Sequence, residues 1–304
     1  MKNHVWLLIF TLLLAGNLAG CQKSEKNSTT DTAARIPLDF LPALYGDYFK
    51  LDSEIVGRPY HIYVRFPEGY DETADRRYPV VYLLDGDSLF PILAANHLFL
   101  HYDDQIPEAI VVGIAYGSFE PGVNMRSYDF STAAADGDPE QGGAADFLAF
   151  LERELLPRVE SSYLADSQQR ILFGQSRGGH LVLYSAFAQP DLFRGRIASN
   201  PTFLPNKEQF HAAPARTDRE DLTLVVTSGS DDHYPQLRED ALAWHERWKE
   251  RGDAPWSIAF SSIPGGTHAA SSVDSYRFGM NRIFEREIRA MRQKLAEARS
   301  AATH

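Results

Sequence analysis

The chain has 304 residues, of which 44% are hydrophobic and 23% charged, and its formal net charge is −11. This length is enough for one large domain with a buried core, so folding requires neither a metal nor a disulfide. The acidic balance excludes an extended nucleic-acid interface, because a phosphate backbone requires a basic protein face. It also disfavours broad electrostatic attachment to an anionic membrane.

The first 20 residues have the pattern of an export signal. Lys2 is followed by an apolar run from Val5 to Leu14 and by small residues before Cys21. The run is too short to favour a membrane-spanning helix, which needs about 20 apolar residues. The segment Leu18-Ala-Gly-Cys21 resembles the lipobox of bacterial lipoproteins, which implies lipidation of Cys21. The alternative is an ordinary cleaved signal with an incidental cysteine.

The lipobox resemblance also implies a location. The exported chain is expected to face the periplasm or the cell exterior, attached to a membrane only through Cys21. Gln22 replaces the aspartate associated with inner-membrane retention, which favours the outer membrane. Composition divides the remainder into a polar tether at residues 21–36, a globular domain at 37–292 and an Ala-rich, charged tail at 293–304 that we expect to be frayed helix. The sequence leaves the oligomeric state open.

Eight short segments have strand character, and four of them are nearly continuous apolar runs typical of strands buried on both faces of a parallel sheet. The predicted strands are Tyr48–Val56, His61–Phe66, Pro79–Leu84, Ala109–Ala115, Arg170–Phe173, Gly195–Ser199, Leu222–Thr227 and Ser257–Ile263. Between them, apolar residues recur at helical spacing, as at Phe147–Leu155 and Tyr276–Met291. The pattern predicts one α/β domain with a mostly parallel central sheet, an antiparallel N-terminal start and helices on both faces.

The segment Gly174-Gln-Ser-Arg-Gly-Gly179 lies between a predicted buried strand and an apolar helical pattern. A serine on such a strand–turn–helix elbow projects its oxygen from the sheet edge, and glycines two positions either side relieve the crowding. The pattern therefore predicts Ser176 as a nucleophile, with the backbone N–H of Arg177 facing a developing oxyanion. The alternative is a glycine-rich turn with an inert serine.

A serine nucleophile needs a base and an orienting acid, which follow it in the order acid, then histidine, in enzymes with this elbow. His268 follows the last predicted strand on a loop, at the sheet edge that carries sites in such folds. His233 also follows the serine but precedes that strand. The acid is expected after the strand Leu222–Thr227, where Asp231 and Asp232 are adjacent. We favour Asp232 and keep Asp231 as the alternative.

The second oxyanion donor is expected in the loop after the strand Pro79–Leu84. Asp85-Gly-Asp-Ser88 follows that strand, and Gly86 would permit a tight turn. We predict the backbone N–H of Asp87 as the donor.

Taken together, the motifs resemble an esterase family that includes siderophore (enterobactin) esterases, S-formylglutathione hydrolase, feruloyl esterases and mycolyltransferases. The matching segments are Tyr78–Gly86, Arg126–Phe130, Phe147–Pro157, Gly174–Gly179, Ser199–Pro201 and Thr267-His268. The resemblance covers about residues 45 to 290 and is strongest to the siderophore-esterase branch. It implies a single-domain α/β-hydrolase fold, hydrolysis of a carboxylic ester without a cofactor, Ser176 as nucleophile and His268 as base. Asn200 departs from the Ser-Pro-Ser pattern of the family.

The sequence leaves several functional questions open. Arg126 and Arg177 are candidates for contact with an anionic substrate, and the alternatives are a buried salt bridge and a solvated side chain, respectively. The partner is predicted to be a small-molecule ester. An acyltransferase could use the same machinery, and a non-catalytic binding lipoprotein could retain the fold. No metal site is predicted, since the sequence has neither His-Glu-x-x-His nor a clustered Cys/His set.

Overall fold

The computed structural model describes residues 41–134 and 137–302. The predicted signal segment, Cys21 and the tether lie outside these residues. Within the described part of the chain, no helix combines the length and the apolar character needed to cross a membrane.

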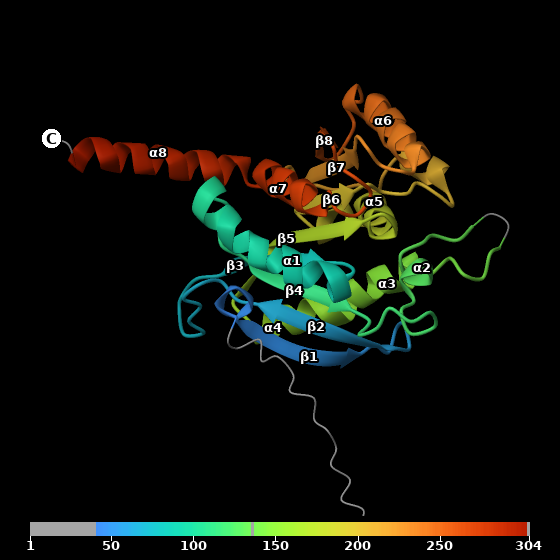
Figure 1. The fold of residues 1–304 in the computed structure, drawn as a ribbon, viewed down its shortest axis with the longest axis horizontal. Coiled ribbons are helices and arrows are strands. Elements are labelled where there is room, and N and C mark those ends of the chain that lie inside the picture. Colours follow the sequence, from blue (N-terminus) through green and yellow to red (C-terminus); the bar gives the residue numbers. More distant parts are fainter. Residues whose placement is uncertain (1–40, 135–136, 303–304) are drawn as a thin grey trace, which may run out of the picture. The chain divides into compact units, whose positions relative to one another are not determined.

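An eight-stranded sheet forms the centre of the domain, in the order β1-β2-β4-β3-β5-β6-β7-β8 (Figure 1). The first three strands in this order pair antiparallel, and the pairs from β4 onward are parallel. The predicted fold class, including the antiparallel start, is confirmed. The strands are β1 (Gly46–Asp52), β2 (Pro59–Arg65), β3 (Tyr78–Leu83), β4 (Ile110–Ala115), β5 (Ala165–Gln175), β6 (Gly195–Ser199), β7 (Thr223–Gly229) and β8 (Ser257–Ile263).

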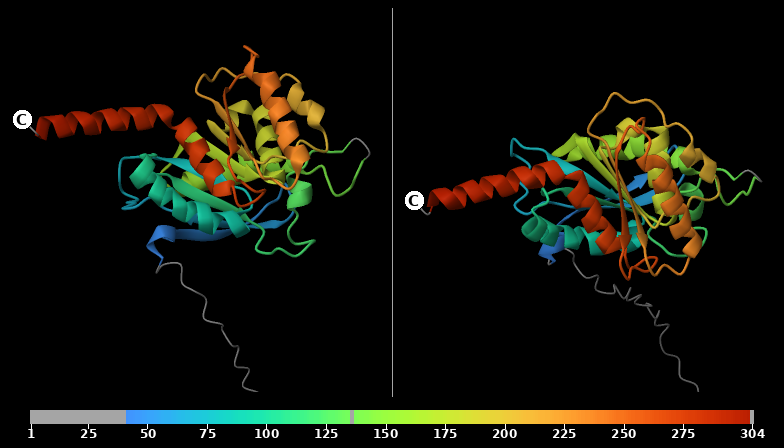
Figure 2. Two further views of the ribbon diagram at one scale, coloured as in Figure 1. Left: turned by 45° about the horizontal axis from the view of Figure 1, so that its top comes forward. Right: turned by 90° about the horizontal axis from the view of Figure 1, so that it is seen from above.

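Helices cover both faces of the sheet (Figures 1 and 2). Helices α1 and α7 pack on one face, and α3 to α6 cover the other. The helices are α1 (Gly86–Phe99), α2 (Arg126–Asp129), α3 (Ala144–Phe150), α4 (Leu156–Ser162), α5 (Arg177–Ala188), α6 (Pro235–Lys249), α7 (Ser272–Ile283) and α8 (Glu285–Ala302).

Burial explains the apolar strands. Every residue of β4 and β6 is buried, because each strand has a neighbour on both edges and helices on both faces. Side chains alternate between the two faces, so β3 sends Val81 and Leu83 into one core and Val80 and Tyr82 into the other. The sheet is thus held rigidly, and its carboxyl edge provides a fixed platform for the loops that follow.

The apolar residues at helical spacing across Tyr276–Met291 lie in helices, as predicted, and are divided between α7 and α8. The structure has two helices that meet at the buried Phe284, where ψ changes to 20° and the helical path is interrupted. The predicted tail continues α8 as far as Ala302, and the side chains of residues 293–301 are exposed.

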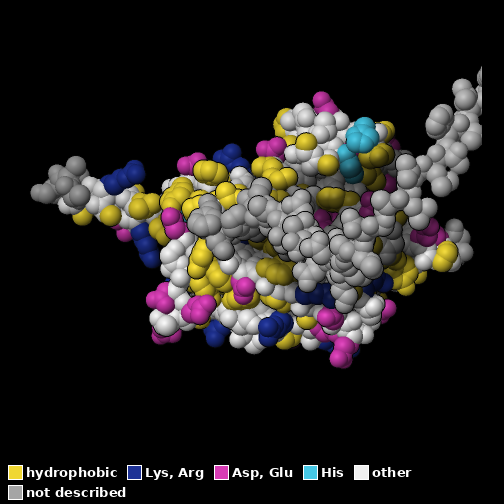
Figure 3. Space-filling view, turned by 60° about the horizontal axis from the view of Figure 1, so that its bottom comes forward, with side chains coloured by type: hydrophobic (Ala, Val, Ile, Leu, Met, Phe, Trp, Pro, Cys, Tyr) yellow, Lys and Arg dark blue, Asp and Glu magenta, His cyan; other side chains and the backbone are white. Residues whose placement is uncertain are grey.

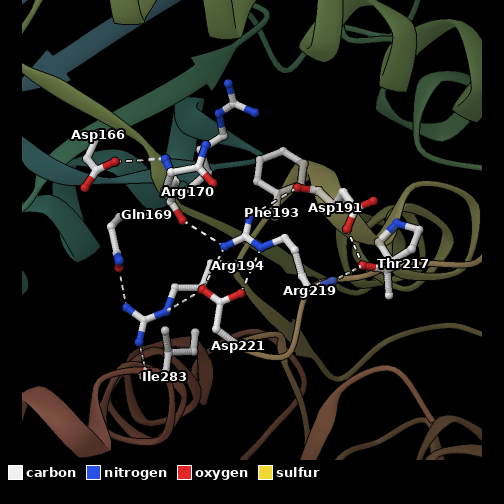
Figure 4. A network of polar contacts seen from close by, with 12 residues as sticks. Asp166, Gln169, Arg170, Asp191, Phe193, Arg194, Thr217, Arg219, Asp221 and Ile283 are labelled. Atoms are coloured by element: carbon white, nitrogen blue, oxygen red, sulfur yellow. Dashed lines mark hydrogen bonds and ion pairs between the residues drawn. The ribbon is translucent and has the colours of Figure 1, made fainter. Parts of the chain in front are cut away.

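Ion pairs gather at the amino edge of β5, β6 and β7. The carboxylate of Asp221 lies between the guanidinium groups of Arg194 and Arg219 (Figure 4). Arg194 also contacts Glu287 of α8 at 2.7 Å, and its side chain is only 9% exposed. This network ties the starts of neighbouring strands to the C-terminal helix.

On the face drawn in Figure 3, acidic and basic side chains are interspersed rather than gathered into one basic patch. Both signs of charge therefore occur on this face of a chain whose formal net charge is −11.

Candidate active site

Ser176 occupies a strained turn between β5 and α5. Its φ of 58° and ψ of −113° are unusual for a non-glycine residue, and the turn is held by a 2.9 Å bond from its N–H to the Ser199 carbonyl. A Cβ on Gly174 would lie 2.3 Å from the Gly178 carbonyl oxygen, so that position requires glycine. At Gly178 the nearest atom would be an Asp85 carboxylate oxygen at 3.2 Å, which is a milder constraint. The backbone is therefore shaped to project the serine oxygen from the sheet.

The side chains of Ser176, His268 and Asp232 form a continuous hydrogen-bonded line. His268 Nε2 lies 3.0 Å from Ser176 Oγ, and its Nδ1 lies 2.8 Å from Asp232 Oδ2. The Asp232 side chain is fully buried and that of His268 is 13% exposed. Both follow strand ends, Asp232 after β7 and His268 after β8. This geometry allows proton transfer from the serine to an imidazole oriented by a carboxylate.

The structure distinguishes the two adjacent aspartates. Asp232 faces His268, and its second oxygen accepts the N–H of Tyr234 at 2.8 Å. The Asp231 carboxylate is exposed and accepts the hydroxyl of Ser230. His233 is exposed and places its ring edge-on to that of His268, with 5.7 Å between centroids. Of the alternatives from the sequence, only Asp232 lies in line with the histidine and the serine.

Of the two predicted oxyanion donors, Arg177 directly follows Ser176, and Asp87 lines a cavity that Ser176 also lines. Arg177 is the first residue of α5 and Asp87 is the second of α1, so neither backbone N–H has a partner within its helix. The Asp87 carboxylate is engaged elsewhere, since it accepts the N–H groups of Tyr116 and Gly117 at 2.8 and 2.7 Å. These contacts fix the loop after β4.

The role expected for Gly86 in the turn needs correction. The left-handed residue is Asp85, with a φ of 55°, and Gly86 begins the helix. Glycine is required at position 86 because a Cβ there would lie 2.7 Å from the backbone nitrogen of Ile114. The close approach of α1 to β4, rather than turn geometry, therefore determines this residue.

Arg126 forms a two-pronged ion pair with Asp85, at 2.6 and 3.0 Å. It also donates to the carbonyl of Gln175, the residue directly before Ser176, at 3.4 Å. The guanidinium thus bridges the loops after β3 and β5, and a remaining 29% of the side chain is exposed beside the site. The sequence alternative of a salt bridge describes this geometry, although contact between Arg126 and a substrate stays a prediction.

A buried carboxylate that the sequence did not single out anchors α2. Asp129 accepts the hydroxyls of Tyr60 and Tyr116 at 2.8 and 2.9 Å and pairs with Arg58. Burial, followed by the nearby carboxylate, raises the pKa of Tyr60, so its phenol remains a donor. The only sequence feature that could have pointed to Asp129 is its position three residues after Arg126 in the same short segment. Asp129 fixes the helix that carries Arg126.

A second histidine lies beneath the elbow. His180 in α5 is fully buried and contacts Thr132 Oγ1 and the Thr202 carbonyl, both at 3.1 Å. Burial lowers its pKa to about 4, so it is neutral at pH 7. It connects α5 to two loops and makes no contact with Ser176 Oγ.

Ser176 lies between two cavities. The larger, of about 970 Å³, also contacts Arg177 and His268, and Arg177 donates there to the Ser131 hydroxyl. Its walls come from the loops before α3, after β6 and after β7, and from the start of α6. The wall residues are Ala134, Gln141, Thr202, Leu204, Pro205, His233, Tyr234, Pro235, Gln236, Leu237 and Asp240.

The smaller cavity, of about 310 Å³, also contacts Ser176 and His268 and includes Asp87, Phe119 and Arg126. Two cavities that adjoin Ser176 provide space for both the acyl and the alcohol portions of an ester. Among the described residues, no cluster of three or more His, Cys, Asp or Glu could hold a metal ion.

Comparison with known proteins identifies the class. Residues 53–272 match the model of the Esterase family, described as "Putative esterase", and the chain belongs to this family of ester hydrolases. It is similar to ferri-bacillibactin esterase BesA of Bacillus subtilis, at 29% identity over 242 residues, covering 72% of this chain and 82% of that protein. It is also 28% identical over 244 residues to a siderophore triacetylfusarinine C esterase of Aspergillus fumigatus, covering 73% and 80%.

The solved structures agree with this assignment. The structure of BES protein from Bacillus cereus superposes with a TM-score of 0.67 at 25% identity, covering 78% of this chain and 94% of the other. An IroE-like serine hydrolase from Shewanella oneidensis gives a TM-score of 0.67 at 24% identity, covering 79% and 80%, which supports the fold. The resemblance to siderophore esterases seen in the sequence is confirmed.

Proposed function

We propose that this enzyme hydrolyses a siderophore-type carboxylic ester through an acyl-enzyme at Ser176. The observation that carries the proposal is the line from Ser176 Oγ to His268 Nε2, at 3.0 Å, and from His268 Nδ1 to Asp232, at 2.8 Å. Support for the substrate class comes from the relatives named as siderophore esterases. The 970 Å³ cavity beside the serine is large enough for a bulky ester.

In this mechanism His268 Nε2 accepts the hydroxyl proton as Ser176 Oγ attacks the ester carbonyl carbon. Negative charge then develops on the carbonyl oxygen, where the N–H groups of Arg177 and Asp87 are proposed to bind it. The protonated imidazole, stabilised by Asp232, donates its proton to the departing alkoxide, which leaves as the alcohol. Water then attacks the acyl-enzyme with His268 as base, releasing the acid and restoring the serine.

The test uses the protein without residues 1–21, assayed on a short-chain aryl ester and on ferric bacillibactin. Wild type should hydrolyse both, and Ser176→Ala should lose about 10⁴-fold or more in kcat. Equal rates for the two proteins would refute the serine mechanism. Turnover of the aryl ester without cleavage of the siderophore would refute only the substrate class. Tight siderophore binding with no turnover of either compound would indicate a binding protein.

We further propose that Cys21 carries the lipid that anchors the enzyme at a membrane. The support is the lipobox-like segment Leu18–Cys21 and the polar tether that follows it. Intact-mass analysis of the mature protein from the membrane fraction should find a diacylated or triacylated Cys21 at the N-terminus. An unmodified Cys21, or cleavage elsewhere, would refute the anchor.

A further inference from the structure

Two side-chain amides converge on the backbone carbonyl of His268. Gln175 Nε2 donates to this oxygen at 2.9 Å, and Asn200 Nδ2 donates to it at the same distance. Gln175 directly precedes Ser176 in the elbow, and Asn200 directly follows β6. The loop that carries the histidine is thus attached to two neighbouring strand ends at one atom.

The orientation of the Asn200 side chain is determined by its surroundings. Its Oδ1 accepts the backbone N–H of Gly229 at 2.6 Å, and this N–H group can only donate. Its Nδ2 faces the His268 carbonyl, which can only accept, and contacts Ser271 Oγ at 2.8 Å. Asn200 is 1% exposed, so its side chain is surrounded by protein. Its φ of 42° is a conformation that Asn and Asp tolerate better than most residues.

The same amide therefore joins the segments that hold the acid and the base. Gly229 ends β7, three residues before Asp232, and the His268 carbonyl belongs to the base itself. We propose that Gln175 and Asn200 form a clamp that positions His268 between Ser176 and Asp232. Neither side chain touches a reacting atom, so both are positioning residues. This inference rests on the proposed function.

The clamp predicts a particular pattern of mutational effects, because both amides donate a hydrogen bond to the same oxygen. Loss of either donor leaves the carbonyl bonded to the other, whereas loss of both removes both side-chain hydrogen bonds to the carbonyl and leaves the loop free to shift. A displacement of about 1 Å in a catalytic group can cost about 10²-fold in rate. The two substitutions are therefore expected to be non-additive.

The experiment compares Gln175→Met, Asn200→Asp and the double variant on an aryl ester. Methionine preserves length without a donor, and aspartate preserves shape, the backbone conformation and the acceptor for Gly229. Each single change should lower kcat about tenfold, and the double change about 10³-fold or more, with KM nearly constant. In a crystal structure of the double variant, His268 Nε2 should lie beyond hydrogen-bond reach of Ser176 Oγ.

Ser275→Ala is the matched control. Ser275 Oγ contacts the hydroxyls of Ser199 and Thr227 in the same buried region and does not touch His268. It should lower Tm while leaving kcat unchanged. A double variant whose loss equals the product of the single losses would overturn the clamp. So would a Ser275→Ala protein that loses as much kcat as the double variant. A wild type that turns over no ester would refute the proposed function, and the clamp with it.

Discussion

Strands β5, β6 and β7 end beside the candidate catalytic groups at one edge of the sheet and begin among ion pairs at the other. At the carboxyl edge, Ser176 and Asn200 have φ values of 58° and 42°, and two cavities adjoin the serine. At the amino edge, Arg194, Arg219 and Asp221 form a paired network. The two edges belong to the same strands, yet one concentrates backbone strain and open space while the other concentrates compensated charge.

This difference teaches how a rigid sheet supports a strained site. A residue held in a sparsely populated conformation costs on the order of 1–3 kcal/mol, and it persists only if its surroundings determine it. Here the surroundings are the strands β5, β6 and β7, which are buried near their carboxyl ends and have helices on both faces. The comparison implies that changes at the carboxyl edge should affect rate, and changes at the amino edge should affect stability.

The largest expected effect is at the carboxyl edge. Asp232→Asn should lower kcat about 10³–10⁴-fold, because an amide at this position cannot stabilise the imidazolium and favours the wrong tautomer. Asp231→Asn is the matched control and should have little effect, because that carboxylate is exposed and bonds only locally. Steady-state kinetics of the two variants on one aryl ester measures the difference. Comparable losses in both would contradict the geometric assignment of the acid.

A smaller effect is expected at the amino edge. Arg194→Met should reduce the free energy of unfolding by about 1–3 kcal/mol, since it removes a buried cation and leaves Glu287 without its partner, although both acidic partners are partly exposed. Urea denaturation reports the change in stability, and kcat at 25 °C should remain at the wild-type value. A fall in kcat without loss of stability would show that the two edges are coupled.

The last prediction concerns the dependence of folding stability on pH, and it also involves a residue at the amino edge. His97 is fully buried between the Tyr276 hydroxyl and the carbonyl of Pro107, which precedes β4. Burial, with a contribution from Arg65, lowers its pKa to about 3. Between that value and the unfolded pKa of about 6.5, only the unfolded chain binds the proton, so this residue makes stability fall as pH drops.

His97→Gln should remove that slope, which is at most about 1.4 kcal/mol per pH unit. Urea unfolding of both proteins at pH 7, 6 and 5 tests this expectation. The wild type should lose its advantage over the variant as the pH falls. Parallel stability curves would mean that His97 is not the buried neutral group described.

Much of this molecule could be predicted from sequence because its strong signals are local. Apolar runs such as Ile110–Ala115 identify buried strands, and the glycines around Ser176 identify the elbow. The sequence could not decide between Asp231 and Asp232. The two are adjacent residues of the same type and differ only in the direction in which their side chains point, which depends on the folded loop. The Arg126–Asp85 pair joins positions 41 residues apart, and nothing in either local pattern specifies the other.

Asn200 illustrates the same limit. In the sequence it was only a departure from a family pattern, whereas its meaning lies in contacts with Gly229 and His268, 29 and 68 residues away. Such a role depends on side chains that meet only once the sheet is complete. Periodicity and motif spacing carry no information about such long-range side-chain contacts.

The order of the strands has a further consequence for how the enzyme acquires activity. Ser176, Asp232 and His268 follow β5, β7 and β8, and the strands β5, β6, β7 and β8 lie side by side in chain order. The three residues are therefore carried by the last four strands of the chain, and His268 follows the last of them. On the proposed mechanism, a chain truncated before β8 would retain Ser176 but lack the residue proposed as its base, so we expect it to have no esterase activity.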